Sequence, residues 1–109
     1  MKYYILNAAG GVESVQSMQV WGEWFTKNPD RVIAKTQVGE AEVSTVFLGI
    51  DHSHDGDVPI LFETMIFEGP HDNWTQRYAT RADAALGHQR AVEALRNGHH
   101  PDENAEGSS

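Results

Sequence analysis

The sequence contains no cysteine. Disulfide bonds, thiol nucleophiles and thiolate zinc sites are therefore excluded, and a reducing compartment such as the cytosol is the expected location. The sequence also lacks an apolar run of membrane-spanning length, and its first residues have no apolar core of signal-peptide length. We therefore expect a soluble, intracellular protein without membrane contact.

Basic residues are scarce in this chain. Lysine and arginine number 8 against 16 aspartates and glutamates, and the formal net charge is −8. A surface this negative repels phosphate backbones, so we expect no direct binding to nucleic acid, whereas a basic protein surface is an eligible partner. The 109 residues suffice for one domain with a single modest core. We assign residues 1–97 to this domain and the polar residues 98–109 to a disordered tail.

The stretch that organises the chain is residues 43–67, where two strand-like runs, VSTVFLGIDH and ILFETMIF, flank a polar loop. Strands are predicted at 2–6 (folding back through 12–15), 31–38, 42–51 and 60–68, and helices at 18–27 and 81–96. Short connections favour antiparallel neighbours. We therefore predict a two-layer α+β fold: an antiparallel meander of three long strands plus a short N-terminal strand, with two helices packed on the sheet.

Both faces of the predicted central hairpin carry large apolar side chains. In a simple register, Val43, Phe47 and Phe62 share one face, while Val46 and Met65 share the other. Water on either face would expose several of these side chains, so either the two helices cover opposite faces or a partner covers one of them. A homodimer is one way to cover the second face.

Four segments occur in an order that resembles a known group of proteins: VSTVFLGIDH at 43–52, ILFETMIF at 60–67, RYAT at 77–80 and ALGHQRAV at 85–92. With the tryptophan-rich helix before them, they resemble small uncharacterised proteins encoded by phages and prophages of actinobacteria. The resemblance covers about residues 18–95 and departs in the central loop, which is more acidic here. It implies an origin in a mobile element, and small phage proteins often bind host machinery or host defence complexes.

Histidines and carboxylates near the central loop form the first candidate site. His52 ends the strand before the loop and shares a face with Glu63 in the simple register, and His88 approaches both if the last helix packs on that face. Two imidazoles and a carboxylate suit zinc, which would activate a water molecule. The alternative is structural, with His88 as a core histidine that forms hydrogen bonds inside the protein.

The polar loop at residues 51–57 is the second candidate. Asp, Ser and Asp at alternate positions, followed by glycine, match the opening of an EF-hand calcium loop, but Phe62 stands where that motif needs a bidentate carboxylate. A hairpin loop rich in Asp, Ser and Gly explains the same pattern. We assign Asp55 and Asp57 to an acidic contact surface.

The third candidate is the group Trp74, Arg77 and Tyr78, which lies in the polar stretch GPHDNWTQRY. Because Trp, Tyr and Arg dominate binding hot spots, Trp74 is typical of an interface anchor. A tryptophan that folds back over the edge of the sheet is the alternative. Arg77 or Arg81, near a predicted helix N-terminus, would also suit the phosphate groups of a small nucleotide.

Together these patterns favour a non-enzymatic binding protein that acts on a host or phage protein, for example as an inhibitor of a host defence system. The contact surface would consist of Trp74, Arg77, Tyr78, Asp55 and Asp57, without a cofactor. Two alternatives stay open. One is a small metal-dependent enzyme, or a metal-stabilised domain, that uses zinc at the histidine–carboxylate group, and the other is a sponge for a small anionic nucleotide.

Overall fold

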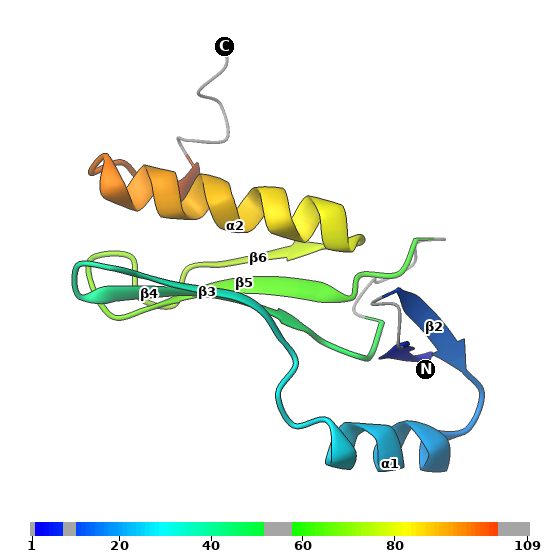
Figure 1. Ribbon diagram of the computed structural model, residues 1–109. Helices are drawn as coiled ribbons and strands as arrows, with labels where there is room; N and C mark the ends of the chain where they lie inside the picture. Colours follow the sequence, from blue (N-terminus) through cyan, green and yellow to red (C-terminus); the bar gives the residue numbers. More distant parts are fainter. Residues whose placement is uncertain (1, 8–10, 52–57, 103–109) are drawn as a thin grey trace.

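The computed structural model describes residues 2–7, 11–51 and 58–102 of the chain. Within these ranges the chain forms six strands and two helices, which build an α+β fold (Figure 1). The elements are β1 (Tyr3–Leu6), β2 (Val12–Val15), α1 (Met18–Lys27), β3 (Val32–Val38), β4 (Ala41–Phe47), β5 (Phe62–Phe67), β6 (Thr75–Tyr78) and α2 (Arg81–Arg96).

An antiparallel meander of four strands, in the order β3-β4-β5-β6, forms the larger sheet. Helix α2 lies along one face of this sheet and contacts all four of its strands (Figure 1). The register sets Val43 opposite Ile66 and Phe47 opposite Phe62. These four side chains are buried, at no more than 1% exposure each. Thr45 and Thr64 share this face, whereas alternation along the strands points Ser44, Val46, Glu63 and Met65 to the face away from α2.

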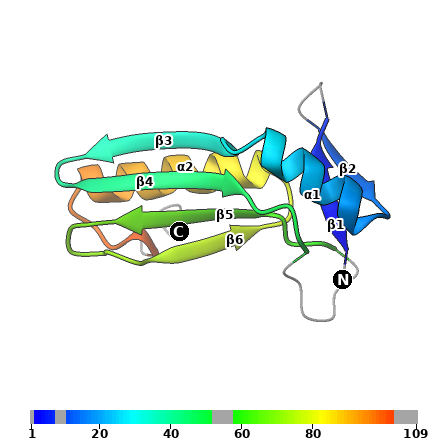
Figure 2. The same ribbon diagram turned by 90° about the horizontal axis from the view of Figure 1, so that it is seen from below.

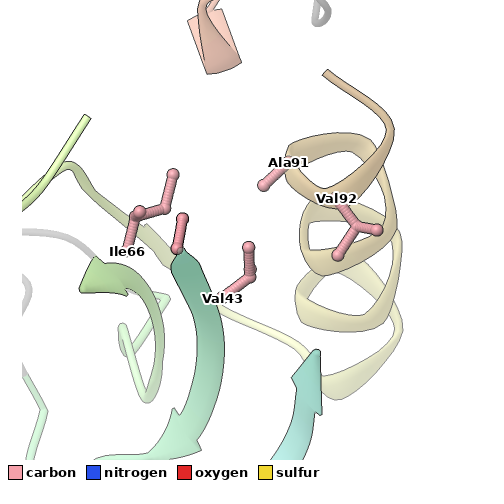
Figure 3. Close-up of a cluster of buried hydrophobic side chains, with 5 residues drawn as sticks. Val43, Ile66, Ala91 and Val92 are labelled. Carbon is pink, nitrogen blue, oxygen red and sulfur yellow. The ribbon is translucent and has the colours of Figure 1, made fainter. Parts of the chain in front are cut away.

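Two clusters of buried apolar side chains fill the space between the sheet and α2. One cluster joins Val43 and Ile66 of the sheet to Ala91 and Val92 of α2 (Figure 3). The other lies at the opposite end of the helix and consists of Phe47, Leu61, Phe62, Tyr78 and Ala84. The helix is therefore held along its length, and its first turn is fixed by the Thr80 hydroxyl, which accepts a hydrogen bond from the Asp83 N–H at 3.0 Å.

The N-terminal part of the chain forms a separate unit at one end of the larger sheet. Strands β1 and β2 pair as an antiparallel hairpin, and α1 packs against this hairpin (Figure 2). The Ser17 hydroxyl caps α1 by accepting hydrogen bonds from two N–H groups of its first turn. The rings of Trp24 and Phe47 lie 5.9 Å apart, edge to face, and link α1 to the second core cluster.

The α+β class and the packing of helices on sheets are confirmed, and one detail differs from the prediction. The meander has a fourth strand, β6, in the stretch that was predicted only as polar. In residues 98–102, which belong to the predicted tail, Pro101 is buried and the Asp102 carboxylate accepts a hydrogen bond from the Trp74 indole N–H. The rest of that predicted tail, residues 103–109, lies outside the described residues.

The face of the larger sheet that points away from α2 carries both apolar and charged side chains. Phe67 is 41% exposed there, and Val32 is 40% exposed. Lys35 pairs with Glu42 across β3 and β4, and Arg77 pairs with Glu63 across β5 and β6. The homodimer expected from two apolar faces stays a prediction, since α2 covers only one of them.

Candidate binding site

A cleft of about 350 Å³ lies between β6 and α2. This volume falls within the range of small-molecule and side-chain pockets. Its wall on one side comes from β6 and the chain just after it, and its wall on the other side comes from α2. The lining residues are Ile60, Trp74, Gln76, Arg77, Tyr78, Ala79, Asp83, Leu86, Gly87, Arg90, Ala91 and Pro101.

The floor of the cleft depends on the close approach of Tyr78 and Gly87. Tyr78 is the last residue of β6, and its ring is 8% exposed. A Cβ atom placed on Gly87 would overlap with the ring and hydroxyl of Tyr78. Glycine in the middle of a helix normally weakens it, so the reason for glycine here is this contact with β6.

Substitution of Gly87 with alanine is therefore expected to destabilise the protein, by about 1–3 kcal/mol, because the Tyr78 ring must leave its packed position. The matched control is Gly22→Ala in α1, where an added Cβ meets no atom within 4 Å. That variant should gain about 0.5–1 kcal/mol from helix propensity. Urea denaturation of both variants measures the difference, and equal changes of the same sign would contradict the account of the cleft floor.

The Tyr78 hydroxyl is a polar group at the base of the cleft. It donates a hydrogen bond to the Gln76 side-chain oxygen at 3.3 Å. Burial raises the pKa of Tyr78 above its ordinary value, although the Thr64 side chain and the nearby Arg90 charge work in the opposite direction. The hydroxyl is thus protonated at neutral pH and acts as a hydrogen-bonding group. Gln76 and Tyr78 together offer a ligand both amide and hydroxyl contacts.

Trp74 closes one end of the cleft and also belongs to the core. Its ring is partly buried against the cluster that contains Val43 and Ile66. Its indole N–H donates a hydrogen bond to the Asp102 carboxylate at 3.1 Å, and Pro101 lies beside it in the lining. The Trp74 ring therefore folds back onto the sheet and also lines the cleft, and its role as an interface anchor stays a prediction.

Arg77 reaches the other side of the sheet from Tyr78. Its Nε donates to a Glu63 carboxylate oxygen at 2.9 Å, and the Glu63 side chain is only 14% exposed. Arg77 therefore contributes mainly its backbone to the cleft. The nucleotide hypothesis assigned phosphate contacts to Arg77 or Arg81. In the structure Arg77 is paired with a carboxylate, and Arg81, in the first turn of α2, also has a partner.

His88 is buried between α2 and the sheet. Its Nε2 and Nδ1 atoms lie 2.9 Å and 2.8 Å from the hydroxyl oxygens of Thr36 and Thr45, and the Thr45 hydroxyl also contacts the Thr64 hydroxyl at 2.5 Å. Hydroxyl groups can donate or accept, so both nitrogens of a neutral imidazole are satisfied. Burial lowers the pKa of His88 and favours that neutral form.

The structure does not bring Glu63 and His88, two of the predicted zinc ligands, together. Glu63 lies between Phe62 and Thr64 on β5, so its side chain points away from α2, while His88 lies on the α2 side. The sheet separates the two groups. Within the described ranges, no group of three or more His, Cys, Asp or Glu side chains is placed to hold a metal ion. His52, the third predicted ligand, lies outside these ranges.

The acidic loop at residues 51–57 is the second site predicted from the sequence. Asp55 and Asp57 fall outside the described residues, so their role in a contact surface stays a prediction. Its flanks are described: the Asp51 carboxylate accepts a hydrogen bond from the Ile60 N–H at 2.9 Å, which ties the two ends of the loop together. The loop therefore starts and ends at a fixed base.

Sequence reasoning placed Trp74 and Tyr78 at a contact surface and missed the α2 wall of the cleft. That wall consists of Asp83, Leu86 and Arg90. Leu86 could have indicated this wall, because it is an apolar residue that lies outside the apolar face of the predicted helix. In the structure its exposed fraction is 51%. The glycine at position 87 offered another, since a mid-helix glycine often marks a close contact.

No protein-family model matches the chain, and neither a curated protein nor a solved structure matches it. Neither of the two described helices is both long enough and apolar enough to cross a membrane. Assignment of a function therefore depends on the geometry of the cleft and on the resemblance described above.

Proposed function

We propose that this chain is a non-enzymatic binding protein that engages another protein through the cleft between β6 and α2. The observation that carries the proposal is the composition of this cleft. It combines a partly buried tryptophan, a tyrosine hydroxyl, an amide and charges of both signs in one concave surface. Trp, Tyr and Arg side chains in a concave setting are typical of binding hot spots.

The proposed partner is a host protein, with inhibition of a host defence complex as the outcome and the host cytoplasm as the location. This part of the proposal is supported by the resemblance to phage and prophage proteins of actinobacteria. The net charge of −8 supports a partner with a basic surface, because opposite charge raises the rate of encounter.

Leu86→Arg tests the proposal at the centre of the cleft wall. Leu86 is half exposed on α2, so the variant should keep its stability within about 0.5 kcal/mol while its larger, charged side chain fills the cleft. We expect at least about tenfold weaker binding to the partner, which equals about 1.4 kcal/mol. The measurement is affinity capture from the lysate of an actinobacterial host, followed by titration of the captured protein.

The matched control is Val20→Arg. Val20 is an apolar residue on α1 with nearly the same exposure, 49%, and it is not among the residues that line the cleft. The proposal predicts that wild type and Val20→Arg capture the same protein and that Leu86→Arg does not. Undiminished capture by Leu86→Arg would rule out the cleft as the contact surface. Trp74→Ala is less suitable, because Trp74 also packs against the core.

A further inference from the structure

Strand β6 is the outermost strand of its sheet on the side of the cleft. It pairs with β5 on one side, and no strand in the described part of the chain pairs with its other side. The Ile66 N–H donates to the Trp74 carbonyl at 3.0 Å, which fixes the alternation of backbone groups along β6. The N–H and C=O groups of Thr75 and Arg77 therefore point outward from the sheet.

The cleft lies on the α2 side of the sheet, with β6 as one of its walls. Only Ala79 and the cap residue Thr80 separate β6 from α2, and the helix runs back in the direction opposite to β6 (Figure 1). In Figure 2 the helix is seen between β3 and β4, while β6 forms the far edge of the sheet. Gly87 touches Tyr78, which places the middle of the helix at the end of β6. An extended segment laid along β6 would have every second side chain on the α2 side of the sheet, the side on which the cleft lies.

The charges on α2 have a definite order along the strand. Asp83 lies beyond the Tyr78 end of β6, and Arg90 lies toward the Trp74 end, one turn after Gly87. The two charges are seven positions apart on the helix, about 10 Å along the axis. In a strand, side chains on one face are about 6.6 Å or about 13 Å apart, so a segment that reaches both charges has one intervening side chain on the same face.

We propose that the cleft takes an extended segment of the partner protein, which adds to β6 as a fifth, antiparallel strand. The proposal rests on the proposed function and specifies the partner's recognition element. Antiparallel addition continues the meander and runs the segment from the Tyr78 end to the Trp74 end. From its N-terminus, the segment then presents a basic side chain to Asp83 and, four residues later, an acidic side chain to Arg90. Backbone bonding supplies affinity and these side chains supply specificity.

Two synthetic peptides of identical composition test the order of charges. The probe is Thr-Lys-Thr-Val-Thr-Glu-Thr, and the control exchanges its lysine and glutamate. We expect the probe to bind about tenfold more tightly, because the exchange converts two attractive contacts into two repulsive ones, each worth up to about 1 kcal/mol. Fluorescence anisotropy with labelled peptides measures both affinities. Equal affinity, or no binding of the probe, would overturn the proposal.

Thr75→Pro tests the role of the strand edge. Thr75 begins β6 and its N–H points outward, so proline removes this donor without breaking the pairing with β5. The control Thr75→Ala keeps the N–H and should bind the probe like the wild type, whereas Thr75→Pro should bind at least about tenfold more weakly. Undiminished binding by Thr75→Pro would overturn strand addition. If the wild-type protein is a dimer by mass and Thr75→Pro is a monomer, then β6 pairs with a second copy of the chain. That result would also overturn the proposal.

The proposed contact surface and the proposed strand addition can be tested separately, because they predict different results. If Leu86→Arg abolishes capture of the partner while neither peptide binds, the cleft is the contact surface but strand addition is wrong. If Leu86→Arg leaves capture intact while the probe peptide binds with the predicted preference, strand addition at β6 holds and the partner docks elsewhere.

Discussion

Replacement of Phe62 with alanine is expected to lower the free energy of unfolding by about 3–5 kcal/mol, the usual loss for a large aromatic residue in a packed core. Phe62 is fully buried, and its ring centre lies 5.5 Å from that of Phe47. It belongs to the cluster that joins the sheet to Tyr78 and Ala84. A loss of this size approaches the whole stability of a domain this small, so the variant should be largely unfolded near physiological temperature.

Phe67→Ala is the matched control on the same strand. Phe67 lies on the sheet face away from α2 and is 41% exposed. Its removal creates no closed cavity, so a loss of no more than about 1 kcal/mol is expected. Guanidinium denaturation of the two variants measures the contrast. A loss at Phe67 that matched or exceeded the loss at Phe62 would contradict the assignment of the core to the α2 face.

The second large effect is expected at His88, through both packing and pH. His88→Ala should cost about 2–4 kcal/mol, because it leaves a cavity and removes the partner of the buried Thr45 hydroxyl and of the partly buried Thr36 hydroxyl. A role for His88 as a metal ligand predicts instead that the variant loses metal binding without this loss of stability. Thermal unfolding with and without a chelator separates the two outcomes.

The direction of the pH effect follows from the lowered pKa of His88. In the unfolded chain His88 has its ordinary pKa near 6.5, and burial lowers the pKa in the folded protein. As the pH falls below about 6.5, the unfolded chain therefore takes up the proton first, and folding loses stability until the pH reaches the folded pKa. Above about pH 6.5 this contribution is fully present.

The titration of His88 can be isolated with glutamine variants. His88→Gln should flatten the decline of stability below pH 6.5, since no imidazole then titrates at this position. His99→Gln, at an exposed position after α2, is the control and should keep the wild-type profile. An unchanged acid decline in His88→Gln would show that other groups, such as carboxylates, cause it.

Much of the fold could be predicted because local signals and tertiary packing agree. The alternation in 31–38 gives β3, and the hydroxyl residues Ser17 and Thr80 begin the helices as expected. The assignment of Val43 and Phe62 to one face was also correct. Strand β6 was missed because three of its four side chains are exposed and polar, so no apolar alternation marks it.

The candidate site could be predicted only in part, because it combines distant segments. Trp74 and Tyr78 stood out by residue type, but the opposite wall depends on which side of α2 faces β6. Sequence periodicity gives the apolar stripe of a helix and not its neighbours at the edge. The positions of Glu63 and His88 on opposite sides of the sheet could not be predicted for the same reason, since they depend on which face of the sheet α2 covers.

Amide hydrogen exchange in the complex with the captured partner tests the central claim most directly. The account predicts that binding slows exchange at Thr75 and Arg77, whose N–H groups point outward from β6. Lys35 and Gln37 on β3, at the opposite edge of the same sheet, are the internal control and should not change. Slowed exchange at Lys35 and Gln37, with none at Thr75 and Arg77, would place the partner at the other edge and contradict the account.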